Sequence, residues 1–208
     1  MRRAQAGWIA GAAAAALVAV GALTYAVTED DGADRTPAAD SADAGFARDM
    51  AIHHQQAVEM SYIVRDRTDD EEVRRLAYDV AQTQANQRGM LLGWLDLWEL
   101  PKVSAKPPMA WMGMGDMPSE GEGALMPGMA TDAQMEKLQT LSGRKAEVYY
   151  LQLMTEHHRG GIHMAEGCAR RCGVEVEKQL AQGMVEGQQS EIDLMTGMLK
   201  ERGATPEA

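Results

Sequence analysis

The sequence contains an internal duplication, and no other feature constrains the fold as strongly. Positions 46–95 align with positions 150–199 without a gap. Two methionines and two histidines occur in both copies, pairing Met50 with Met154, His53 with His157, His54 with His158 and Met60 with Met164. Four of the five histidines in the chain are therefore in register. Because a repeat of this size buries its apolar face against its copy, we expect two similar halves packed together.

Each copy has the pattern of a helical hairpin. A capping box, Thr68-x-x-Glu71, is expected to divide the first copy into two helices near residues 67–70. In the second copy Gly173 stands where a C-cap glycine would end the first helix. A last helix is expected to follow it and to stop at Gly203. These signals predict four main helices, arranged as two hairpins.

The segment that joins the copies carries turn and cap signals. Residues 101–130 are rich in Pro, Gly and Met, which predicts a loop. A second capping box, Thr131-x-x-Gln134, opens a helical stretch that residues 142–143 (Ser-Gly) are expected to interrupt. Strand signals are absent, and an aromatic content of 5% disfavours β-sandwiches and barrels. We predict an all-α four-helix bundle over residues 45–203, built from a duplicated helical hairpin.

The N-terminal segments indicate a protein that works outside the cytoplasm. Residues 8–27 carry no charge, and about 20 residues are enough to cross a bilayer as a helix. Arg2 and Arg3 precede them, so residues 1–7 are expected in the cytoplasm. Residues 28–44 are acidic and rich in small residues, as in a flexible tether. A single-pass membrane anchor is our prediction; a cleaved signal sequence, leaving a secreted or periplasmic protein, is the alternative.

The charge of the chain restricts its partners. The 31 acidic residues outnumber the 20 Lys and Arg, giving a formal net charge of −11. A nucleic-acid partner is disfavoured, because phosphate binding needs a basic face. An acidic protein is suited to meeting cations.

The residues shared by the two copies form a stripe of possible metal ligands. At helical periodicity the stripe of each first helix carries the methionines and histidines of the duplication, namely Met50, His53, His54 and Met60, then Met154, His157, His158 and Met164. His163 points away from it. Imidazole and thioether together select copper over zinc, magnesium or calcium. The alternative is core packing, although packing has no need for paired imidazoles on an apolar stripe.

The second helix of each hairpin adds further donors. In the second copy these are Gln188, Glu191 and Met195. The corresponding positions of the first copy hold Gln84, Gln87 and Leu91, which argues against two equivalent sites.

Six methionines are concentrated in the loop between the copies. They are Met109, Met112, Met114, Met117, Met126 and Met129. Clustered thioethers can hold Cu(I), and Trp111 could cover such a cation with its ring. The alternative is a loop that folds back and buries its methionines on the bundle.

Two cysteines, Cys168 and Cys172, are spaced by one helical turn near the predicted end of a helix. In an oxidising compartment they could form a local disulfide. In reduced form they could extend the stripe of soft ligands. The spacing permits both states.

Several catalytic signatures are missing from the sequence. No Glu-x-x-His is present, which disfavours a di-iron carboxylate site. Haem-attachment, nucleophile-elbow, Walker A and dinucleotide-binding motifs are also missing. We therefore expect a protein that is not an enzyme.

The motifs resemble those of the DUF305 family. The similar segments are FARDMAIHHQQAVEM (46–60), MPGM (126–129), YLQLMTEHHRGGIHMA (150–165) and QQSEIDLM (188–195). The family includes periplasmic copper-binding proteins with a ferritin-like four-helix bundle. The resemblance implies that this chain has the same fold and binds copper outside the cytoplasm through the histidines and methionines of the duplicated motif.

The sequence leads to one main functional expectation and two alternatives. We expect a copper-binding protein that sequesters Cu(I), or Cu(II) at mixed His/Met sites, or passes it to a copper exporter or another envelope copper protein. One alternative is a metal-free bundle of the cell envelope that binds protein partners. The other is a copper oxidase or reductase, which would keep an open coordination position for its substrate.

Overall fold

The computed structural model describes residues 36–115 and 123–206, and the residues from Pro37 onward form one unit. The described ranges contain no strand, and their helical elements are α2 (Ala42–Arg65), α3 (Glu71–Leu97), a 3₁₀ turn η1 (Ala110–Met112), α4 (Asp132–Thr140), α5 (Gly143–Arg171) and α6 (Glu175–Glu201). None of these helices has the length and apolar character needed to cross a membrane. The predicted anchor, residues 8–27, lies outside the described residues.

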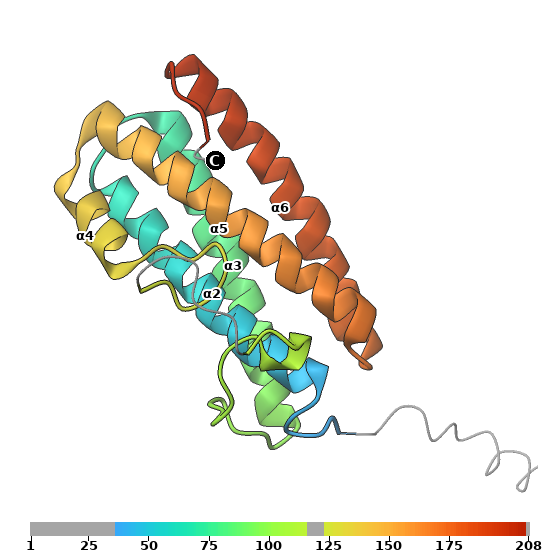
Figure 1. The fold of residues 1–208 in the computed structure, drawn as a ribbon. Helices are drawn as coiled ribbons and strands as arrows, with labels where there is room; N and C mark the ends of the chain where they lie inside the picture. Colours follow the sequence, from blue (N-terminus) through green and yellow to red (C-terminus); the bar gives the residue numbers. More distant parts are fainter. Residues whose placement is uncertain (1–35, 116–122, 207–208) are drawn as a thin grey trace, which may run out of the picture. The chain divides into compact units, whose positions relative to one another are not determined.

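The long helices form two hairpins that meet through their first members (Figure 1). Helix α3 folds back along α2, α6 folds back along α5, and α2 packs directly on α5. The short helix α4 lies against α2 and α5. The predicted all-α bundle of a duplicated hairpin is therefore confirmed at the level of a helical bundle, with α4 as an additional short helix.

The turn between α2 and α3 differs in detail from the prediction. Asp70, not Thr68, is the N-cap of α3, and its side chain accepts a hydrogen bond from the backbone of Val73 at 3.0 Å. The Thr68 hydroxyl instead donates to Glu147 of α5 at 2.6 Å and accepts from the Asp70 amide. The predicted capping box with Glu71 was wrong because Thr68 is used to attach the turn to the other hairpin.

The remaining helix ends follow the sequence signals with one exception. The capping box between Thr131 and Gln134 is formed, and Gly203 adopts a left-handed conformation (φ 69°) after α6. The predicted C-cap role of Gly173 was wrong. Helix α5 ends at Cys172 in an extended conformation, and the Gly173 amide donates to Asp43 at 2.8 Å. A side chain from α2 therefore satisfies a backbone donor between α5 and α6.

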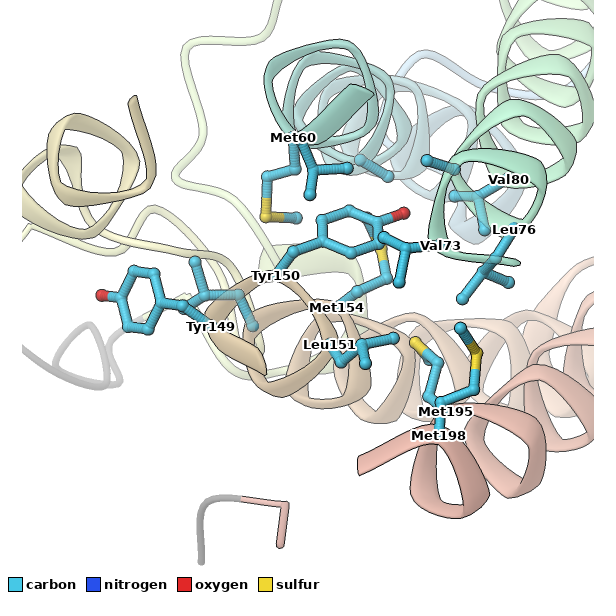
Figure 2. Close-up of a cluster of buried hydrophobic side chains, with 14 of the residues drawn as sticks. Met60, Val73, Leu76, Val80, Tyr149, Tyr150, Leu151, Met154, Met195 and Met198 are labelled. Atoms are coloured by element: carbon cyan, nitrogen blue, oxygen red, sulfur yellow. The ribbon is translucent and has the colours of Figure 1, made fainter. Parts of the chain in front are cut away.

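The core has one cluster of buried side chains toward each end of the bundle. The first cluster contains Met60, Tyr150, Met154 and Met195, among residues of α2, α3, α5 and α6 (Figure 2). The second contains Phe46, Met50, Leu91 and Met164. Because α2 and α5 run in opposite directions, each cluster receives the first shared methionine of one copy and the second of the other.

The segment after α3 is packed on the bundle. Asp49 of α2 accepts hydrogen bonds from the Met109 amide at 2.8 Å and from the Trp111 indole at 2.9 Å. The Trp111 ring lies directly over Gly45, where a Cβ would come within 2.5 Å of it. The Met112 thioether occupies the space beside Gly167 of α5. Two glycines thus allow the loop to dock closely on α2 and α5.

Candidate metal centre

Four histidines meet in the interior where α2 crosses α5. His53, His54, His157 and His158 are all 0% exposed. The His53 and His157 ring centroids are 3.8 Å apart, and Nε2 of His157 lies 3.0 Å from the carbonyl oxygen of His53. Nε2 of His158 lies 2.5 Å from a carboxylate oxygen of Glu191 on α6. The structure therefore brings together the histidines that the duplication singled out.

Most of the polar atoms in this cluster form no hydrogen bond of normal geometry among the described residues. Both ring nitrogens of His53 and of His54 lack a hydrogen bond of normal geometry, as does Nδ1 of His157 and of His158. The polar groups that face them are the Pro127 backbone for His53 and the side chains of Gln84 and Gln87 for His54. The side-chain amide of Gln188 has no partner in the described ranges. Buried polar atoms are nearly always paired in proteins, so such a concentration of exceptions needs a reason. Imidazole nitrogens with free lone pairs are the donors that a metal ion requires.

His53, His54 and His157 are held in the neutral form that binds metals. Burial, reinforced by the neighbouring histidines, lowers the pKa of His53 to about 3. Burial likewise lowers the pKa of His54 to about 3. The pKa of His157 is well below its usual value for the same reasons. At neutral pH these rings carry no charge, so metal binding would not have to displace a proton from them.

The methionines of the duplicated motif lie on both sides of the histidines. Met50 and Met164 are buried in one core cluster, and Met60 and Met154 are buried in the other. The structure therefore places two thioethers toward each end of the cluster of histidines. Met195 lies in the same cluster as Met60 (Figure 2). The Thr155 hydroxyl lies 3.9 Å from the Met195 sulfur.

The second helices of the two hairpins contribute unequally. Glu191 of α6 contacts His158, whereas the equivalent residue on α3 is Gln87, without a charge. Gln188 lies against Gly161 of α5. A Cβ on Gly161 would lie 2.4 Å from the side-chain oxygen of Gln188. Leu91 is fully buried and offers no donor in the place of Met195. The expected inequality of the two copies is therefore visible in the side chains around the histidines.

The MPGM segment, residues 126–129, lies across α5 next to the histidines. Gly128 (φ 77°) and Gly160 approach so closely that a Cβ on Gly160 would lie 2.1 Å from the Pro127 carbonyl oxygen. The Gln56 side chain holds the end of the segment with two hydrogen bonds to the backbone of Ala130, at 2.7 and 2.8 Å. Gly160 follows the His157-His158 pair in α5, so the segment covers one side of the centre. The role of Gly160 was missed, although a Gly-Gly pair inside a helix signals a close approach.

The methionines of the loop are not gathered in a separate exposed site. Met109, Met112 and Met126 are buried in the core cluster that also holds Met50, and Met114 and Met129 are partly buried against it. The alternative of a loop that folds back on the bundle is the arrangement found for these five. Met117 lies outside the described residues. The Met114 sulfur is 3.5 Å from Nε2 of the exposed His163, a contact that the sequence did not predict.

Cys168, in the last turn of α5, forms a disulfide with Cys172, the C-cap residue of that helix. In this state their sulfurs are bonded to each other and are not thiolate ligands. One residue close to them was missed: Glu177 is fully buried beside the disulfide. As an acid in the first turn of a helix it resembled an ordinary surface residue.

Solved structures similar to this chain include two proteins of one family. A DUF305 protein from Streptomyces coelicolor, provisionally named as secreted, is 74% identical over 82% of this chain and 99% of that chain, with a TM-score of 0.77. A DUF305 fragment from Deinococcus radiodurans is 28% identical over 77% of this chain and 96% of that chain, with a TM-score of 0.63.

A more distant similarity links the chain to CopM in its Cu(I)-bound form. It is 17% identical over 76% of this chain and 96% of that chain, with a TM-score of 0.58, so the likeness is one of fold. No curated protein matches this chain. The sequence model of DUF305, a domain of unknown function, matches residues 43–199. That match and the 74% identity to the Streptomyces protein show that the chain belongs to the DUF305 family.

Proposed function

We propose that this protein binds copper outside the cytoplasm and holds it for storage or transfer. The observation that carries the proposal is the group of four fully buried histidines whose ring nitrogens largely lack hydrogen bonds of normal geometry. Neutral imidazoles in such a place lose hydrogen bonds to water on folding, and a bound ion would replace them. Gln188 and Glu191 would support the ion from α6.

The donor set favours copper among the biological metals. Thioethers bind Cu(I) well and are poor ligands for zinc, magnesium or calcium, and methionines lie on both sides of the histidines. The imidazoles accept Cu(II) as well as Cu(I). CopM, which shares the fold, has been solved in Cu(I)-, Cu(II)- and silver-bound forms, and this supports the choice. We also propose that the helical bundle is of the ferritin-like type.

Storage or transfer fits the centre better than catalysis. All four imidazoles are fully buried and the MPGM segment covers one side, whereas a catalytic metal keeps a position open for substrate. The partly buried Met114, whose sulfur lies 3.5 Å from Nε2 of the exposed His163, would give an additional Cu(I) contact near the surface, next to the buried loop methionines. The partner in transfer would be a copper exporter or another envelope copper protein. The location follows from the charge-free segment 8–27, as anchor or signal, and agrees with the provisional naming of the Streptomyces relative.

Anaerobic Cu(I) titration against a competing chelator tests the proposal. We expect tight binding by the purified protein and at least a hundredfold loss of affinity in the double variant His53→Ala/His157→Ala. Met90→Leu on the exposed side of α3 is the matched control and should bind as the unchanged protein does. Circular dichroism of each variant separates loss of metal from loss of fold.

The result also distinguishes the alternatives. A folded protein that binds Cu(I) only weakly would contradict the proposal and favour a metal-free bundle of the envelope. Oxygen consumption by the copper-loaded protein with a reducing substrate would instead favour an enzyme. If the double histidine variant bound Cu(I) as tightly as the unchanged protein, the copper ligands would be the methionines.

A further inference from the structure

The disulfide of α5 lies beside a buried carboxyl group that the copper proposal does not use. Cys168 is in the last turn of α5, Cys172 ends that helix, and Glu177 reaches back to them from the first turn of α6. The two sulfurs and a carboxylate oxygen of Glu177 all lie within 4.8 Å of one another. All three side chains are buried. Two chain segments thus bring three potential ligands to one point.

Glu177 is buried with one polar neighbour among the described residues, the carboxyl group of Asp43 on α2. Neither of its carboxyl oxygens forms a hydrogen bond of normal geometry within the described ranges. The adjacent Asp43 already accepts two backbone hydrogen bonds, from Gly173 at 2.8 Å and from Val174 at 2.7 Å. Burial, the charge of Asp43 and a side-chain contact with Asp43 raise the pKa of Glu177 to about 9. An apolar side chain would pack here without the cost of burying one carboxyl group beside another, so stability alone does not explain this residue.

The three donors match a known class of metal site once the disulfide is opened. Cysteine thiolates bind zinc at about 2.3 Å and carboxylates at about 2.0–2.2 Å, in tetrahedral geometry. In such a centre the two sulfurs would lie about 3.8 Å apart and each sulfur about 3.5–3.7 Å from the carboxylate oxygen. These separations are within the 4.8 Å that contains the three donors. Water can supply the fourth ligand. In the disulfide form the sulfurs have no charge to offer, so the site is closed.

We propose that Cys168, Cys172 and Glu177 form a zinc-binding site that opens only when their disulfide is reduced. The proposal goes beyond copper binding and does not rest on it, because no ligand is shared with the histidine centre. Cys172 is the less buried of the two cysteines, since it is 6% exposed and Cys168 is 0% exposed.

A dithiol can supply the two electrons that the reduction needs. A thiolate of the reductant attacks the Cys172 sulfur, and Cys168 leaves as a thiolate that takes up a proton. The second thiol of the reductant then displaces Cys172, which is also protonated, and the reductant becomes a disulfide. Zinc binding releases three protons, two from the thiols and one from the Glu177 carboxyl. Reoxidation of the cysteines returns two electrons to an acceptor disulfide and expels the metal.

Cobalt(II) is the probe for the test, because thiolate ligands give it an intense charge-transfer absorption in the near ultraviolet. The full chain is titrated anaerobically with Co(II), either oxidised or after reduction with a phosphine. We expect one Co(II) per reduced chain with the thiolate band, no band for the oxidised chain, and loss of the band on adding zinc. Cys168→Ser/Cys172→Ser should show no band.

Glu177→Gln identifies the third ligand. It has the shape of the protonated carboxyl, so the fold should be kept, as far-ultraviolet circular dichroism would verify. We expect the reduced variant to keep the thiolate band and to bind Co(II) about tenfold or more weakly. His53→Ala/His157→Ala should retain the band and full affinity, which separates this site from the copper centre. Reduced protein without a thiolate band, or equal affinity in Glu177→Gln, would overturn the proposal.

Discussion

His53 and His54 in the centre of the bundle lose their hydration on burial, and this makes the stability of the protein sensitive to acid. The pKa of an imidazole in the unfolded chain is about 6.5, whereas His53 and His54 have native pKa values of about 3. Between these values the unfolded chain binds protons that the native protein does not. The free energy of unfolding must therefore fall as the pH decreases from about 6.5 toward 3.

We expect this loss to be about 1.4 kcal/mol per pH unit for each neutral buried histidine. Urea unfolding at intervals between pH 4.5 and 7 measures it. His54→Gln removes one titrating group, so its stability should depend less steeply on pH. Identical slopes for the variant and the unchanged protein would show that His54 is protonated in the native state.

Glu177 gives a pH dependence of the opposite sign. Its native pKa of about 9 lies above the unfolded value near 4.5, so the native protein binds a proton that the unfolded chain releases. Stability should therefore fall as the pH rises from about 4.5 to 9. We expect Glu177→Gln to become more stable relative to the unchanged protein by about 1.4 kcal/mol per pH unit between pH 7 and 8.5. A constant difference between the two over this range would contradict a buried neutral carboxyl.

At the scale of elements, the contact between the MPGM segment and α5 can be tested with one methyl group. Alanine normally stabilises a helix relative to glycine by about 0.5–1 kcal/mol. In Gly160→Ala the methyl group would collide with the Pro127 carbonyl, so we expect a loss of about 1–3 kcal/mol instead, measured by urea unfolding.

Gly183→Ala on α6 is the matched control, because a Cβ there meets nothing within 4 Å. It should give the ordinary helical gain. If Gly160→Ala showed the same gain, the MPGM segment would not be packed on α5 in solution.

Much of the element structure could be predicted from the sequence, for identifiable reasons. The duplication and the capping signal at Thr131 depend on local spacing, and both reappear in the structure. Thr68 and Gly173 were misjudged because their hydrogen bonds are made with distant partners, Glu147 of α5 and Asp43 of α2. A pattern within one segment carries no information on such partners.

The same limit applies to the candidate site. The pairing of four histidines followed from the repeat, since equivalent residues of a packed duplication meet near its axis. The division of the methionines between two clusters required knowledge that α2 and α5 run in opposite directions. Burial of the loop methionines depended on Gly45 and Gly167, whose role appears only when Trp111 and Met112 are placed beside them.

For the molecule as a whole, metal binding and folding should be coupled. A ligand that binds only the native state stabilises it by about 2.7 kcal/mol at a hundred times its dissociation constant. For a domain of this size that corresponds to a rise in Tm of about 5–10 °C. We expect Ag(I), a redox-inert substitute for Cu(I), to produce such a shift by differential scanning fluorimetry. His53→Ala/His157→Ala should show little of it, and an equal shift would contradict a centre on these residues.

The packing of α2 on α5 has a consequence for how a duplicated sequence of this kind could have evolved. Each hairpin carries two of the four buried histidines, so a single hairpin by itself holds half of the centre. Two separate hairpins would form the complete histidine centre only as a dimer, and a bound metal ion would then stabilise that dimer. Joining them in one chain replaces that concentration-dependent encounter with an intramolecular one. It also allows the two halves to differ in sequence. Glu191 in the second copy, where the first copy has Gln87, shows that they have diverged.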